Sequence, residues 1–74
     1  MDKLIKILEN IKPGVDFTKE SHLISDGILT SFDIVTLIAN LTEEYDIEIT
    51  VSDIIPENFE SAATILQLIN SKED

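Results

Sequence analysis

The chain contains no cysteine. Disulfides and thiolate metal sites are therefore excluded, and any thiol chemistry must come from a bound group. Long apolar runs are also missing, and the first residues include the charged side chains Asp2, Lys3 and Lys6. A secretory signal and a membrane-spanning helix would both need such a run. We expect a cytoplasmic protein without membrane insertion.

Positive charge is scarce, since neither lysine nor arginine occurs from residue 20 to residue 71 and the formal net charge is −10. Acidic residues recur throughout that span. A negative field repels nucleic acid and anionic lipid, and it attracts basic partner surfaces or divalent cations. The alternative is that these acids only maintain solubility. We expect no nucleic-acid partner.

The length of 74 residues predicts one domain, residues 1–74, with a small core and a stability of only a few kcal/mol. We expect a monomer.

Helical spacing of apolar residues predicts two helices in the first part of the chain. The first begins near Asp2, ends before Pro13, and carries Leu4, Ile7, Leu8 and Ile11. The second runs from about Ser31 to Tyr45, with a core stripe of Ile34, Leu37, Ile38, Leu41 and Tyr45. The residues between them predict a long ordered loop, held by Val15, Phe17, Leu23, Ile24, Ile28 and Leu29.

Residues 46–52 alternate polar and apolar side chains, a strand pattern with no convincing second strand to pair with it. We therefore predict an extended connector with Ile47, Ile49 and Val51 directed toward the core. Ser52 or Asp53 is the expected cap of a short helix that ends at Pro56.

Phe59 is the expected anchor before a last helix. Ser61 should cap that helix, which is expected to reach about Asn70. Its inward residues would be Ala62, Ile65, Leu66 and Ile69. Together these elements predict an all-α protein: a small four-helix bundle with a long loop between helices one and two and a short third helix.

Ser31 has a distinctive place at the start of the second helix. Thr30 has Asp33 three positions later, the pattern of a capping box with an acidic partner. Ser31 is then the first helical residue, where an attached anion would meet unpaired N–H groups and the positive end of the helix dipole. This position favours a phosphate on Ser31.

A second apolar line on this helix consists of Phe32, Val35 and Ala39, flanked by Asp33 and Glu43. It starts at the proposed site, so it could be a partner-binding strip. The alternative is a widened core face, because isolated exposed apolar residues are common.

Four segments resemble the acyl carrier protein family, and together they span nearly the whole chain. They are Asp26-Gly27-Ile28-Leu29-Thr30-Ser31-Phe32, Glu43-Glu44-Tyr45, Ile54-Ile55-Pro56 and Asn58-Phe59-Glu60-Ser61. The lead-in to Ser31 is more similar to carriers of dedicated pathways, including the D-alanyl carrier type, than to the fatty acid biosynthesis carrier.

The resemblance implies that Ser31 receives 4'-phosphopantetheine from coenzyme A through a phosphopantetheinyl transferase. The thiol of this arm would hold an acyl or aminoacyl group as a thioester. Further expected partners are a loading ligase and downstream enzymes with basic docking surfaces, which would recognise Thr30, Phe32, Asp33, Val35, Ala39 and Glu43. A long acyl chain could lie against Ile34, Ile38, Ile54, Phe59 and Ala62. The alternative is that these residues merely fill the core, since small interiors pack tightly.

The chain departs from the family pattern at the serine itself. The usual Asp-Ser-Leu triplet is Thr30-Ser31-Phe32 here, so the cap is kept while the adjacent negative charge is lost. Acids expected further along the helix are replaced by Thr36 and Thr42. The alternative function is therefore an acidic helical interaction module that is carrier-like but unmodified.

Other patterns give no catalytic or metal site. His22 lies near Ser21 and Asp26, but nothing in the sequence supplies the geometry of a nucleophile and base. Residues 46–52 place oxygens at alternate positions like a calcium loop, yet Val51 occupies the position that requires glycine. We expect no enzyme activity and no high-affinity metal site, while weak binding of divalent cations by the acidic surface stays open.

Overall fold

The structure is a computed structural model that describes residues 2–73. It contains three α-helices, α1 (Asp2–Ile11), α2 (Ser31–Tyr45) and α3 (Ala62–Lys72), and two short 3-10 turns, η1 (Val51–Asp53) and η2 (Pro56–Asn58). No strand occurs within residues 2–73, so the all-α prediction is confirmed.

The two 3-10 turns stand where a short third α-helix was predicted. Thr50 precedes the first turn, in place of the predicted caps Ser52 or Asp53, and its backbone N–H donates to the Asp53 carboxylate at 2.9 Å. Pro56 begins the second turn instead of ending a helix, because its fixed φ suits a first helical position. Residues 54–55 lie between the turns, so the predicted count of four helices is not confirmed for the part of the chain described.

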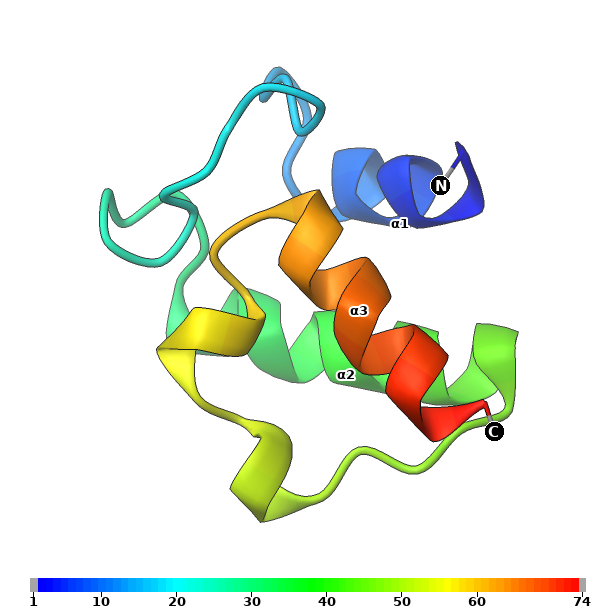
Figure 1. Ribbon diagram of the computed structural model, residues 1–74. Helices are drawn as coiled ribbons and strands as arrows, with labels where there is room; N and C mark the ends of the chain where they lie inside the picture. The colour runs from blue at the N-terminus through cyan, green and yellow to red at the C-terminus, as the bar shows by residue number, and fades with distance from the viewer. Residues whose placement is uncertain (1, 74) are drawn as a thin grey trace.

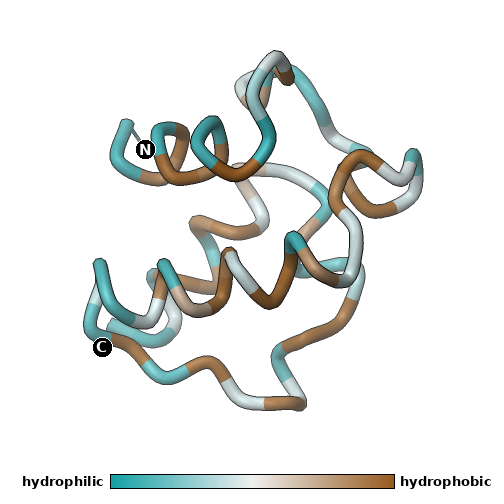
Figure 2. The backbone as a smooth tube through the Cα atoms, turned by 180° about the vertical axis from the view of Figure 1, so that it is seen from behind, coloured by the Kyte–Doolittle hydropathy of each residue, from teal (hydrophilic) through white to brown (hydrophobic). Residues whose placement is uncertain are grey.

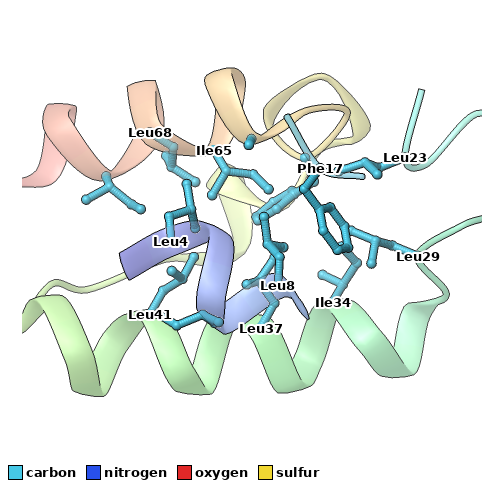
Figure 3. Close-up of a cluster of buried hydrophobic side chains, with 14 of the residues drawn as sticks. Leu4, Leu8, Phe17, Leu23, Leu29, Ile34, Leu37, Leu41, Ile65 and Leu68 are labelled. Atoms are coloured by element: carbon cyan, nitrogen blue, oxygen red, sulfur yellow. The ribbon is translucent and has the colours of Figure 1, made fainter. Parts of the chain in front are cut away.

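The core is built around α1, which packs against both α2 and α3. Figure 3 shows side chains of α1 directed between the other two helices. The hydrophobic (brown) residues of α1 face the rest of the molecule in Figure 2. The fully buried side chains of these helices are Leu4, Leu8, Leu37, Leu41, Ile65 and Ile69. Each such side chain contributes roughly 1.5–3 kcal/mol relative to an exposed one.

The predicted core stripes of α1 and α2 are confirmed, with Ile11, Ile38 and Tyr45 half-buried at their edges. In α3, Leu68 is buried while the predicted Leu66 is only half-buried.

The connector differs from the prediction at Val51, and α3 ends two residues later than predicted. Val51 is 87% exposed, not directed toward the core, because it opens the η1 turn. The last helix continues past Asn70 to Lys72, whose ammonium lies 2.6 Å from the Asp53 carboxylate.

The loop between α1 and α2 is ordered by contacts with the residue before the α3 cap. The Glu60 carboxylate accepts hydrogen bonds from the backbone N–H groups of Ile24 (2.9 Å) and Ser25 (3.0 Å) and from the Ser25 hydroxyl. The Glu60 carbonyl accepts the Leu23 N–H at 2.8 Å. Gly27 takes a left-handed conformation (φ 72°) that a glycine adopts without strain. The loop prediction is confirmed, with Phe17, Leu23 and Leu29 buried.

The elements place the start of α2 far from both ends of the described chain. Figure 1 shows the beginning of α1 and the end of α3 at one end of the molecule and the first turn of α2 at the other. The connector returns along α2 toward that first turn, so η2 comes to lie near it. Within residues 2–73, no helix has the length and apolar character needed to cross a membrane.

Candidate functional site

The first turn of α2 is fixed by the predicted capping box, which the structure confirms. The Asp33 N–H donates to the Thr30 hydroxyl at 3.2 Å, and the Asp33 carboxylate accepts the Thr30 N–H at 3.0 Å. Ser31 is the first residue of the helix and is exposed. The reciprocal hydrogen bonds therefore hold the backbone on both sides of an accessible hydroxyl.

Lys12 supplies the positive charge nearest to this turn. Its ammonium lies 3.0 Å from the Asp33 carboxylate. The Thr30 backbone N–H, followed by the Lys12 ammonium, lowers the pKa of Asp33 below its usual range. No sequence pattern indicated Lys12 as part of the site, although the scarcity of lysines in so acidic a chain was a signal that those present would pair with acids.

The apolar strip of α2 is exposed rather than buried. The exposed fraction is 79% for Phe32 and 67% for Val35, and Ala39 is also exposed. A widened core face, the alternative interpretation of these residues, is therefore wrong. Asp33 is half-buried beside the strip, and Glu43 is exposed further along the helix.

A groove with a volume of about 340 Å³ has Ser31 in its lining. Its lining comes from α2, from the connector and from the loop before α2. Four of the five predicted pocket residues lie in it: Ile34, Ile38, Ile54 and Phe59. Further lining residues, which the sequence did not assign to the pocket, include Leu29, Val35, Ile55 and Pro56.

The fifth predicted pocket residue, Ala62, does not line this groove. It is buried at the first position of α3 and borders a different cavity, together with Ile5 and Phe17. The prediction failed because helical spacing gave the inward face of α3 but not which side of the core its first turn meets.

Some of the predicted pocket residues belong to the buried core, and others form a partly exposed wall of the groove. Phe59 and Ile34 are buried core residues, whereas Ile54 is 43% exposed. Both earlier interpretations, core filling and pocket lining, therefore describe part of this set.

The connector wall of the groove is fastened at Asp53. Its carboxylate pairs with the Lys72 ammonium and accepts the Thr50 N–H, and its carbonyl accepts the Asn58 side-chain amide at 2.7 Å. The Lys72 ammonium, followed by the Thr50 backbone N–H, lowers the pKa of Asp53 to about 2. This carboxylate therefore stays ionised at neutral pH and ties the connector to the last turn of α3.

Protonation of Asp53 in acid should break its ion pair with Lys72. The folded-state pKa of Asp53 is below its ordinary value of 3.8, so its contribution to stability is present above about pH 4 and is lost as the pH falls toward 2. We expect the melting temperature of the wild type to fall over that window, and Asp53→Asn to melt lower at pH 7 with a shallower decline. Melting curves from pH 2 to pH 7 measure this, with the exposed Glu57→Gln as control. A decline of equal slope in Asp53→Asn would contradict the assignment.

The remaining polar residues form no further constellation. His22 is exposed, and its Nδ1 lies 3.3 Å from the Ser21 hydroxyl. Across residues 2–73, no three His, Cys, Asp or Glu side chains are grouped so that they could hold a metal ion.

The site fits a phosphate-linked arm on Ser31. The capping box uses the N–H groups of Thr30 and Asp33. An anion on Ser31 would lie near the Ser31 and Phe32 amides at the positive end of α2. The Lys12 ammonium pairs with the Asp33 carboxylate of the same helical turn. The apolar groove that Ser31 lines gives a tethered group a surface to lie on.

Comparison with known proteins gives one curated relative with high similarity. The chain is 40% identical over 68 residues to Aminoacyl carrier protein 1 from Bradyrhizobium diazoefficiens, and the match covers 90% of this chain and 74% of that protein. No family model matches the chain. No solved structure matches it either. Because the match covers nine-tenths of the chain, it includes Ser31 and all of α2.

Proposed function

The chain belongs to the acyl carrier protein family, and from this we propose that Ser31 carries a 4'-phosphopantetheine arm transferred from coenzyme A. When bound, the arm supplies a terminal thiol that holds an acyl or aminoacyl group as a thioester. The chain's own contribution is to attach, orient and present that group, which raises its effective concentration at successive enzymes. In this proposal the chain performs no catalysis.

The observation that carries the proposal is the position of Ser31. The residue is exposed at the first position of α2, its flanking backbone is fixed by the capping box, and it lines the groove. Thr30 preserves the cap where the family usually has aspartate. The Asp33 carboxylate, 3.0 Å from the Thr30 N–H, keeps a negative charge in the same turn.

We take residues 1–74 as a single carrier domain that acts as a cytoplasmic monomer. The turns η1 and η2 would be the counterpart of the short third helix, giving four helical segments in family order. The expected partners are a phosphopantetheinyl transferase, a loading ligase and downstream enzymes with basic docking surfaces. The name of the relative makes aminoacyl cargo one candidate.

Partner docking would use the exposed strip of Phe32, Val35 and Ala39, with Thr30, Asp33 and Glu43 beside it. The strip combines large apolar side chains with neighbouring acids, on a chain with a net charge of −10. Aromatic side chains commonly dominate the binding energy of an interface, while complementary charge mainly accelerates encounter.

Intact mass tests the proposal directly. After incubation with coenzyme A and a broad-specificity transferase, the wild type should gain the mass of one arm, and Ser31→Ala should gain none. The exposed Ser52→Ala, which removes a hydroxyl outside the site, should behave as the wild type.

A wild type that gained no mass, or an arm retained by Ser31→Ala, would overturn the attachment. The first result would favour the unmodified interaction module. For that module, neutralising Glu43 and Glu44 should weaken binding to a basic partner, while Ser31→Ala should not.

A further inference from the structure

The Asp33 carboxylate is held in the α2 cap through one of its two oxygens. Asp33 Oδ2 accepts the Thr30 N–H at 3.0 Å and the Thr30 hydroxyl at 3.1 Å, and the Lys12 ammonium lies 3.0 Å from the same oxygen. Within residues 2–73, Asp33 Oδ1 accepts no hydrogen bond. The carboxylate therefore keeps a spare acceptor oxygen in the turn that begins with Ser31.

Two backbone donors in the same turn have no acceptor. The Asp33 N–H donates to the Thr30 hydroxyl, but among the residues that the structure describes the N–H groups of Ser31 and Phe32 donate to none. Such first-turn amides attract anions, and an aspartate side chain readily bonds to amides close to it in sequence. The Asp33 carboxylate and an incoming phosphate group would therefore compete for these two amides.

Lys12 stands on a backbone that is fixed at the end of α1. The residue directly follows that helix, its N–H donates to the Leu8 carbonyl at 2.9 Å, and Pro13 after it limits its backbone conformation. The dipole of α1 also favours a positive charge at this end. Lys12 therefore offers a fixed cation that holds the Asp33 carboxylate at Thr30 and offsets its charge.

We propose that Lys12 is a positioning residue for attachment of the arm: it holds the Asp33 carboxylate at Thr30 and so keeps the Ser31 and Phe32 amides open to the phosphate of coenzyme A. The inference rests on the proposed attachment at Ser31. In that reaction the Ser31 hydroxyl oxygen bonds to the phosphorus that carries the arm, and the serine proton passes to a base. The phosphoanhydride bond of coenzyme A breaks, and the adenosine bisphosphate half leaves with its electron pair.

Arm transfer to Lys12→Met should be about tenfold slower in kcat/KM than transfer to the wild type. The variant keeps a side chain of similar length and loses the ammonium, so phosphate must displace a charge-assisted hydrogen bond of Asp33 before it reaches the amides. Lys12→Arg restores the charge and should recover most of the rate. Lys6→Met, at an exposed residue of α1, changes the net charge equally and should behave as the wild type.

An Asp33→Asn background separates a role through Asp33 from a direct one. No carboxylate competes for the amides in that background, so adding Lys12→Met should lower the rate no further. An equal loss in both backgrounds would mean that Lys12 acts directly on coenzyme A or on the transferase, and it would overturn the inference.

Hydrogen exchange followed by NMR tests the position of the carboxylate at pH 7 without a transferase. In Lys12→Met the Ser31 and Phe32 amides should exchange more slowly than in the wild type, because the Asp33 carboxylate then accepts from them, and the Thr30 amide should exchange faster. A general loss of stability would instead speed exchange at Ser31 and Phe32, since the helix would open more often.

Equal transfer rates for Lys12→Met and Lys6→Met would overturn the inference. Unchanged or faster exchange at Ser31 and Phe32 in Lys12→Met would also overturn it. A wild type that gained no arm would overturn the proposed function instead, and exchange rates measured on the unmodified protein would then still show where the Asp33 carboxylate lies.

Discussion

Phe59→Ala should leave most of the protein unfolded at 25 °C. The Phe59 ring is 1% exposed and belongs both to the core and to the floor of the groove. Truncating a buried phenylalanine to alanine destabilises a protein by about 3–5 kcal/mol, because transfer energy is lost and a cavity remains. A domain of 74 residues has a total stability of about that size.

Phe32→Ala is the matched control, since the same atoms are removed from a ring that is 79% exposed. Substitutions at such surface positions usually change the free energy of unfolding by less than about 0.5 kcal/mol. Urea unfolding followed by circular dichroism measures both variants. Similar midpoints for the two would show that the Phe59 ring is not a core residue.

Phe32→Ala should nevertheless slow modification of Ser31 by about thirtyfold in kcat/KM. The ring is one position after the proposed attachment residue and is fully available to a partner. Loss of an aromatic hot-spot residue removes about 2 kcal/mol or more of interface energy, and a loss of that size in transition-state binding corresponds to the stated factor. Initial rates of arm transfer, measured by mass, test this.

Val35→Ala should lower the same rate in the same direction by a smaller factor, because it removes two methyl groups from the strip. Val51→Ala is its control: Val51 is also an exposed valine, but it lies on the η1 turn away from α2. Equal rates for all three variants and the wild type would rule out the strip as the transferase docking surface.

The local features of the site could be predicted because they depend on neighbours in sequence. The hydroxyl of Thr30 and the carboxylate of Asp33 are three residues apart, so the capping box and the helical start at Ser31 follow from spacing alone. The core stripes of α1 and α2 likewise follow from a period of 3.6 residues.

The features that failed depend on contacts between distant segments. Asp53 pairs with Lys72, nineteen positions later, and this contact ties the connector to the last turn of α3. No sequence spacing indicates such a pair. The two 3-10 turns and the exposed position of Val51 were therefore not predicted, and α3 ends two residues beyond the predicted Asn70. Ala62 was assigned to the groove for a related reason, because a helical pattern gives a buried face without its neighbours.

The contact between Glu60 and the loop also determines when the site can form during synthesis. Glu60 holds the backbone of Ile24 and Ser25, which precede it by 36 and 35 positions. Those hydrogen bonds cannot exist on a nascent chain until Glu60 has left the ribosome. The loop that leads into Ser31 therefore cannot reach its final conformation while only α1, the loop and α2 have emerged.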